Sequence, residues 1–287
     1  MVKSSLFYIK TILKSPILLF LIGFTIFLTY NIQPSLNFSV FYFVRFYYYA
    51  FICSNLFFLI TATRIMSKDF DILSYFEKDI VRKQRVILLS TFLISLIMAV
   101  FPILLILTTK NSMIGLPITL KGIGHFIIIL LLSNLIATLI GSTVGIIVKN
   151  DFSILISGAI YGLLLLESTQ ISNTLIHKYL NIFDDYLTVS SNTLSEVIFN
   201  GTYYLDKLFL LLLILLIHSL VRCVYGQKKR TFFYILPLFI FFALVCTYIL
   251  GARNLQTFVP YEELKTDAYS IQSYKMELEL QDRKSVV

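Results

Sequence analysis

The residues of this chain that could do chemistry are few and scattered. Its three histidines, His125, His177 and His218, are far apart, and no H-E-x-x-H pair is present to hold a hydrolytic zinc ion. The adjacent Glu262 and Glu263 stand in a polar stretch and lack the following arginine that a membrane-embedded acidic pair would need. Neither a G-x-S-x-G nucleophile motif nor a G-x-x-x-x-G-K-[ST] phosphate-binding loop occurs. We therefore predict that the chain is not an enzyme, binds no metal or cofactor, and carries no ATP site of its own.

Long apolar runs make up most of the chain and would have to position any site. A helix needs about 20 residues to cross about 30 Å of hydrocarbon, and most of the runs approach or reach that length. The runs are Pro16–Asn31, Phe46–Thr63, Val86–Thr108, Gly124–Val148, Phe152–Leu166, Leu208–Tyr225 and Phe232–Leu250. The sequence predicts an all-α, polytopic helical membrane protein with about seven transmembrane helices, six plus one.

Composition supports a membrane protein. Hydrophobic residues make up 57% of the chain and charged residues 14%, against about 45–50% and about 25% in soluble domains. Lys and Arg outnumber Asp and Glu, 24 to 16, and the excess falls on alternate connections between the runs. The positive-inside rule then predicts a cell-membrane protein with its N-terminus in the cytoplasm and its C-terminal tail outside. No basic and aromatic patch stands apart from the membrane flanks, so we expect a lipid-bilayer partner and no nucleic acid.

Residues 1–15 have the pattern of an amphipathic helix. Lys3, Lys10 and Lys14 share one face, with Ile9 and Ile12 on the other. The segment predicts a helix in the cytoplasmic interface, although a ragged basic start to the first span gives a similar pattern.

The connection between the second and third runs also has helical periodicity. Ile72, Leu73, Phe76 and Ile80 recur at helical spacing within Asp69–Val81, among acidic residues, and basic residues follow. We predict a short amphipathic helix there, which either lies on the membrane surface or docks into a groove on a cytoplasmic partner.

These segments together resemble the permease subunit of an export-type ABC transporter. The resemblance rests on Lys3–Lys14, on Ser67–Arg85, and on the very short loop Lys149–Asp151 between the fourth and fifth runs. It covers most of residues 1–225, and the chain departs from the six-span form by the added run Phe232–Leu250.

The resemblance implies a function and partners. The chain would be the membrane-spanning subunit of an ATP-driven exporter for a peptide-like or amphipathic substrate, with ATP bound by a separate ABC ATPase subunit and a second permease copy or paralogue completing the pathway. The coupling role would fall on the apolar residues of the helix after the second span, namely Phe70, Ile72, Leu73 and Phe76. The alternatives are an ATPase-independent sensor, a channel subunit or an intramembrane enzyme.

Small and polar residues inside the runs predict contacts between helices. Gly141 and Gly145, and likewise Gly158 and Gly162, form G-x-x-x-G motifs that allow close backbone approach. Asn134, Ser133, Ser157 and His218 are expected to hydrogen-bond between helices. Arg45 borders an aromatic segment, where it either reaches the outer headgroups or contacts an anionic substrate.

The chain thus divides into an interfacial helix at 1–15, a transmembrane domain at 16–250 and an extracytoplasmic tail at 251–287. Within the tail, apolar and polar residues alternate from Tyr274 to Gln281, which predicts one β-strand that needs a partner sheet. A tail without fixed structure is the alternative.

Overall fold

The computed structural model describes residues 2–31, 47–67, 80–109, 116–165, 179–183, 201–225 and 232–256. Within these ranges the chain forms α-helices and short turns and no strand. The helices are α1 (Val2–Leu13), α2 (Pro16–Asn31), α4 (Tyr48–Ser67), α6 (Ile80–Thr109), α8 (Leu116–Ile147), α9 (Phe152–Leu163), α11 (Gly201–Tyr225) and α12 (Phe232–Gln256). The all-α prediction is confirmed for this part of the chain.

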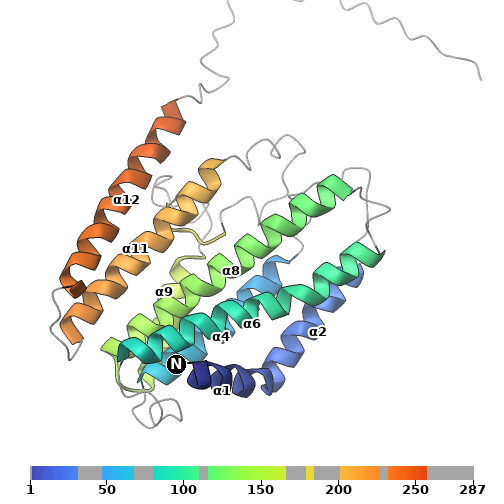
Figure 1. Ribbon diagram of the computed structural model, residues 1–287, viewed down its shortest axis with the longest axis horizontal. Coiled ribbons are helices and arrows are strands. Elements are labelled where there is room, and N and C mark those ends of the chain that lie inside the picture. The colour runs from blue at the N-terminus through green and yellow to red at the C-terminus, as the bar shows by residue number, and fades with distance from the viewer. Residues whose placement is uncertain are drawn as a thin grey trace, which may run out of the picture.

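The helices form a bundle around α8. This helix packs against α4, α6, α9 and α11, and its contact with α4 is the most extensive in the molecule. Helix α12 lies at one edge of the bundle and packs on α11, as Figure 1 shows. Helices α2 and α1 lie at the other side, against α6.

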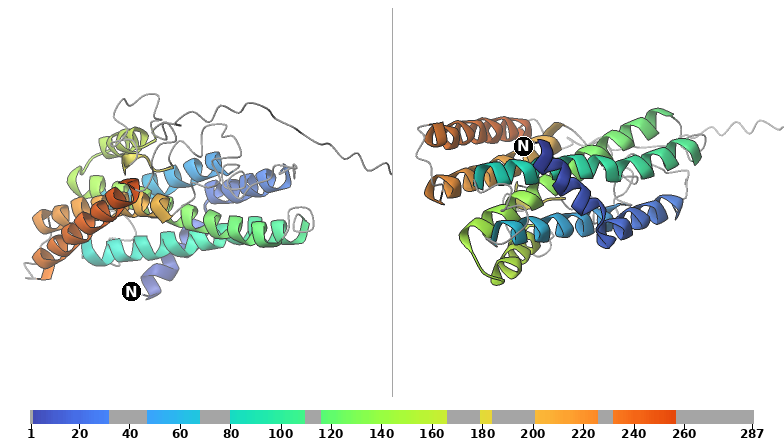
Figure 2. Two further views of the ribbon diagram at one scale, coloured as in Figure 1. Left: turned by 90° about the horizontal axis from the view of Figure 1, so that it is seen from above. Right: turned by 60° about the horizontal axis from the view of Figure 1, so that its bottom comes forward.

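Successive helices from α2 to α12 run in alternating directions (Figures 1 and 2). The last residues of α4, α8 and α11 and the first residues of α6, α9 and α12 therefore lie at the same end of the bundle, with α1 across that end. Exposed basic side chains gather there, namely Lys10, Lys14, Arg64, Arg82, Arg85 and Lys149. We call this the basic end.

Four helices are long and apolar enough to cross a membrane, judged by length and composition. They cover Tyr48–Ser67, Ile80–Thr108, Ile123–Ile147 and Tyr204–Tyr225. Three further apolar helices are shorter, Pro16–Asn31, Phe152–Leu163 and Ile235–Leu250. The 12 residues of α9 span only about 18 Å.

Several helices extend beyond the apolar runs that predict them. Helix α6 begins at Ile80 and not at Val86, α8 at Leu116 and not at Gly124, and α11 at Gly201 and not at Leu208. The difference arises because the ends of a helix are set by its backbone hydrogen bonds, which continue into polar residues. Hydropathy detects only the apolar portion of the helix. Ile80 and Val81 therefore belong to α6, and not to the separate helix predicted over Asp69–Val81.

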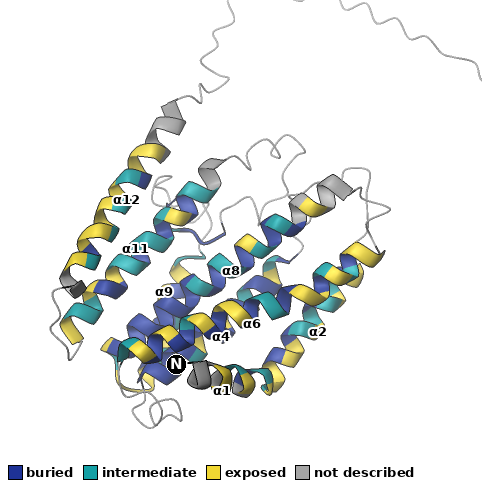
Figure 3. Cartoon of the chain, viewed as in Figure 1, coloured by how far each residue is buried: buried dark blue, intermediate teal, exposed yellow. Residues whose placement is uncertain are grey.

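Apolar side chains cover the outside of the bundle as well as its core (Figure 3). Phe20 of α2, Leu155 of α9 and Phe239 of α12 are 68%, 69% and 70% exposed. Contiguous surfaces of this kind are unusual on soluble proteins. They suit helices that face lipid.

Candidate functional site

The closest helix contact in the described bundle depends on two glycines of α8. A Cβ placed on Gly141 would lie 2.4 Å from the Leu59 carbonyl oxygen of α4, and one on Gly145 would lie 2.7 Å from the Thr63 carbonyl oxygen. Both distances are far below an ordinary contact, so only glycine allows α4 and α8 to approach this closely.

The second G-x-x-x-G motif behaves differently. A Cβ on Gly158 or Gly162 of α9 would meet nothing within 4 Å. Among the described residues the α9 motif makes no close helix contact, because α9 presents these glycines away from α4 and α8. The structure thus distinguishes two motifs that have the same spacing in the sequence.

A ladder of hydrogen bonds crosses the middle of the bundle. Asn134 of α8 is fully buried; its Oδ1 accepts from the Ser54 hydroxyl of α4 at 2.9 Å, and its Nδ2 donates to the Ser95 hydroxyl of α6 at 2.8 Å. One turn on, the Thr138 hydroxyl lies 3.3 Å from the Thr91 hydroxyl of α6. The ladder fixes the register of α4, α6 and α8 relative to one another, since the two partners of each hydrogen bond lie at the same level along the helix axes.

Helix α9 also makes buried hydrogen bonds, and its partner is α4. Asn55 of α4 donates its amide proton to the Tyr161 hydroxyl at 2.8 Å, and the Thr63 hydroxyl lies 3.1 Å from that of Ser157. All four side chains are buried. Two polar contacts therefore hold the short α9 to α4.

Near the basic end, His218 of α11 lies between α6 and α8. Its Nδ1 is 2.7 Å from the Thr143 hydroxyl, and its Nε2 meets the Gln84 amide nitrogen. The other described histidine in an apolar helix, His125, contacts the Tyr204 hydroxyl near the opposite end. His125 and His218 therefore lie near opposite ends of the bundle, and the described residues hold no group of three or more His, Cys, Asp or Glu side chains that could bind a metal.

The end opposite the basic end is covered by residues 179–183, which we call the strap. The Ile182 amide donates to the Leu164 carbonyl at the end of α9 at 2.9 Å. Phe183 stacks on Phe51 of α4, with ring centroids 6.1 Å apart, and Tyr179 packs against Phe209 of α11 at 4.8 Å. The strap therefore touches helices that lie on different sides of the bundle.

A buried ammonium group holds the strap to α11. Lys207 is 1% exposed, and its Nζ donates to the Asn181 carbonyl at 2.8 Å. Asp206 beside it is also buried. Burial raises the pKa of the Tyr179 phenol above its usual range, and the charge of Asp206 and the nearby Tyr248 add to the effect.

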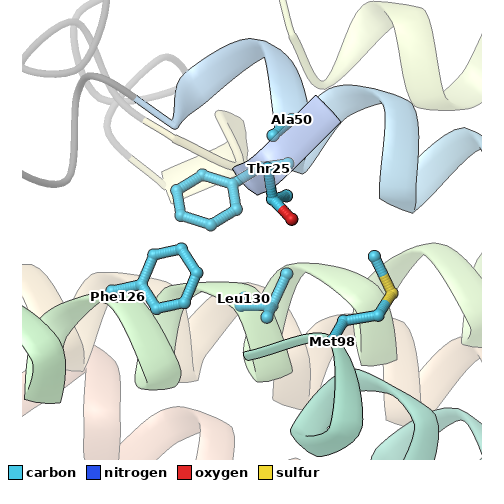
Figure 4. A pocket seen from close by; sticks show the side chains of 6 residues that line it. Thr25, Ala50, Met98, Phe126 and Leu130 are labelled. Carbon is cyan, nitrogen blue, oxygen red and sulfur yellow. The ribbon is translucent and has the colours of Figure 1, made fainter. Parts of the chain in front are cut away.

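A small cavity lies where α2, α4, α6 and α8 meet (Figure 4). It offers about 10 Å³ to the centre of a water molecule, which is about the minimum for one water. Apolar side chains and one hydroxyl line it, those of Thr25, Ala50, Phe51, Met98, Phe126 and Leu130. It is a gap in the packing and not a chamber for a substrate.

The structure tests only some of the predicted site residues. Asn134, Ser157 and His218 bond between helices, which confirms that prediction, whereas the Ser133 hydroxyl bonds to the Leu130 carbonyl of its own helix. The remaining predicted positions lie outside the described residues, namely Phe70, Ile72, Leu73, Phe76, Arg45, His177, Glu262, Glu263 and the strand from Tyr274 to Gln281.

Sequence reasoning missed several partners in these contacts. Gln84, Thr143, Tyr161 and Lys207 were not singled out, because each lies far along the chain from the residue it meets. A polar residue in an apolar run signals that a partner exists, but not which one. Comparisons of the chain with protein-family models, curated proteins and solved structures gave no significant match.

Proposed function

We propose that this chain is the membrane-spanning permease subunit of an ATP-driven ABC exporter for a peptide-like or amphipathic substrate. One observation supports this proposal above the others. The Lys149 ammonium of the turn between α8 and α9 lies 3.4 Å from the Met66 carbonyl at the end of α4. The short α8–α9 turn and the last residues of α4, which the candidate coupling segment follows in the sequence, are therefore neighbours.

That neighbourhood suits a docking surface for an ATPase. The resemblance assigns the coupling role to Phe70, Ile72, Leu73 and Phe76, which follow Ser67 directly. Ser67 itself is buried against α8, because its backbone nitrogen lies 3.2 Å from where a Gly145 Cβ would be. A movement of segment 68–79 would pass into α8 through this contact, and α8 packs on α4, α6, α9 and α11.

We further propose that the basic end faces the cytoplasm. Of the two acidic residues in the described ranges, Asp151 is at that end, among six exposed cations. The positive-inside rule and an anionic inner leaflet both favour this orientation. The chain then crosses the cell membrane seven times, with α1 in the inner interface and the tail outside, and α9 is completed at its outer end by the strap.

The pathway would form between two permease subunits, of this chain or a paralogue. The strap would close the outer end of each subunit's own helix bundle. Four of its five side chains are buried, and Lys207 holds its backbone.

The test uses the tagged full-length chain, purified in mild detergent from cells that make it at native level. We expect an ATP-hydrolysing subunit to copurify with the wild type, and the double substitution Leu73→Asp with Phe76→Asp to remove it. Two carboxylates on the apolar face cannot enter an apolar groove without a large desolvation cost. Ser74→Asp, whose side chain would lie about 100° from Leu73 and about 160° from Phe76 around the same predicted helix, is the matched control.

The outcomes are distinct. Loss of the ATPase in the double variant, with membrane insertion unchanged and Ser74→Asp like the wild type, supports the proposal. Equal ATPase recovery in all three samples contradicts the docking role. Substrate turnover or ion conductance by the purified chain, without any ATPase, would favour an enzyme or a channel subunit.

A further inference from the structure

Three helices meet at one imidazole near the basic end. His218 of α11 is 2% exposed, and it contacts Gln84 of α6 and Thr143 of α8. These contacts join the edge pair α11 and α12 to the central bundle, because α12 packs on α11. The imidazole is therefore one of the contacts that attach this pair, beside the packing of α11 on α8.

The hydrogen bonds define which ring nitrogen carries the proton. The Thr143 hydroxyl has one proton and donates it to the Leu139 carbonyl at 2.7 Å. Thr143 must then accept from His218 Nδ1–H at 2.7 Å. His218 Nε2 is left as an acceptor, and the Gln84 amide nitrogen donates to it. All three contacts are satisfied with a neutral imidazole.

A second proton would charge an imidazole that is only 2% exposed, which costs free energy unless an anion pairs with it. Gln84 Oε1, which has no hydrogen-bond partner among the described residues, can accept from the new Nε2–H only after a half-turn of the amide, and it brings no negative charge. On α11, Arg222 lies one helical turn further on.

The surrounding charges are also positive. From α6 the buried Lys83 adjoins Gln84, with Arg82 and Arg85 exposed nearby, and Lys149 follows the end of α8. Lys10 is on α1 and Lys14 follows its last residue, and the described side chains of α12 include no charged one. The two acids of the described residues are the exposed Asp151 of the α8–α9 turn and Asp206, twelve positions from His218 on α11.

We propose that His218 is a proton-sensitive joint that attaches α11 and α12 to α6 and α8. In the closed state the neutral imidazole contacts Gln84 and Thr143, as in this structure. In the open state these contacts are lost, and the imidazole is exposed to water and binds a proton. Acid therefore shifts the population toward the open state. The proposal does not depend on the transport function.

The size of the response follows from linkage. An imidazole in water titrates near pH 6.5, so between pH 7.5 and pH 5 the open-to-closed ratio rises about 30-fold. The lower the pH, the larger the open fraction.

The experiment measures the separation of α11 and α6 in the full chain in lipid nanodiscs. One spin label is placed on the native Cys223 of α11 and one on Leu89→Cys, an exposed, uncharged position of α6, with Cys53 and Cys246 replaced by alanine. Both labels are attached at neutral pH, so that thiol reactivity does not enter the comparison. The distance distribution is then recorded at pH 7.5 and pH 5.

The joint predicts a longer-distance population that grows on acidification in the parent protein. His218→Gln cannot take up the proton and is expected to show no change. Gln84→Glu supplies a carboxylate that pairs with the protonated imidazole, and it is expected to keep the joint closed at pH 5. His125→Gln, at the buried histidine near the opposite end, is expected to respond like the parent.

Each outcome bears on the proposal. A parent distribution that is the same at both pH values overturns it, and so does an acid response that persists in His218→Gln. If His218→Gln fails to fold, Gln84→Glu decides, because an opening as large as the parent's would contradict the role of the imidazole.

Discussion

Replacing the α8 glycines with alanine should loosen the bundle, whereas the same change in α9 should not. At Gly141 the new Cβ would lie 2.4 Å from the Leu59 carbonyl oxygen and 2.8 Å from the Thr63 hydroxyl. An ordinary contact begins at about 3.4 Å, so α4 and α8 must separate by roughly 1 Å. The Thr63 hydroxyl, which bonds to Leu59 O at 2.8 Å and meets Ser157 at 3.1 Å, must move as well.

The expected cost can be estimated from these contacts. Overpacking of a tight core costs about 1–3 kcal/mol, and a lost interhelical hydrogen bond in a membrane costs about 0.6 kcal/mol. Alanine recovers about 1 kcal/mol through its higher helix propensity. We expect Gly141→Ala, and likewise Gly145→Ala, to lower the free energy of unfolding by about 1–2 kcal/mol, a factor of about 5 to 30 in the equilibrium constant.

Gly158→Ala and Gly162→Ala are the matched controls, since no described atom of another helix lies within 4 Å of either new methyl group. They should leave stability unchanged or raise it by up to about 1 kcal/mol. The free energy of unfolding is measured by SDS titration in lipid bicelles, followed by far-ultraviolet circular dichroism. If Gly141→Ala and Gly158→Ala proved equally stable, the close approach of α4 and α8 would be refuted as a determinant of the fold.

Three other changes test the polar interior and the strap. Asn134→Leu removes two interhelical hydrogen bonds and should lower the free energy of unfolding by about 1–3 kcal/mol in the same titration. Ser54→Ala should lower it less in the Asn134→Leu protein than in the wild type. Equal losses would mean that the two residues are not coupled. Lys207→Met should release the strap, so that a cysteine at Ile182 reacts at least tenfold faster with a membrane-impermeant thiol reagent; an unchanged rate would show that the ammonium does not hold the strap. The pKa of Tyr179 is raised in the folded state, so the unfolded chain loses this proton first, near pH 10. The free energy of unfolding should therefore fall as pH rises from 9 to 11. A fall of the same size in Tyr179→Phe would assign the loss to other groups.

The helices were predictable because a long apolar run has one stable form in lipid. Every backbone group must bond within the segment, which leaves the helix. Helix ends were less predictable: the first turns of α6 include Lys83 and Gln84, which carry no apolar signature. Their helical form is visible only in the structure.

The interior contacts were predictable in kind but not in detail. Asn134 and His218 stand out in the sequence because an unpaired polar group in an apolar helix is costly. Their partners depend on which faces of distant helices meet. The two G-x-x-x-G motifs make the same point, since Gly141 touches α4 and Gly158 touches nothing within 4 Å of its Cβ position, although both have the same spacing.

Helix α12 has its extensive packing with α11 alone. Gain or loss of such a peripheral helix would leave the α4–α8 contact and the Asn134 ladder intact. If α12 crosses the membrane, as we propose, its gain or loss would also transfer everything that follows to the opposite compartment. In such a chain the compartment that receives the C-terminal residues would change during evolution without any repacking of the interior.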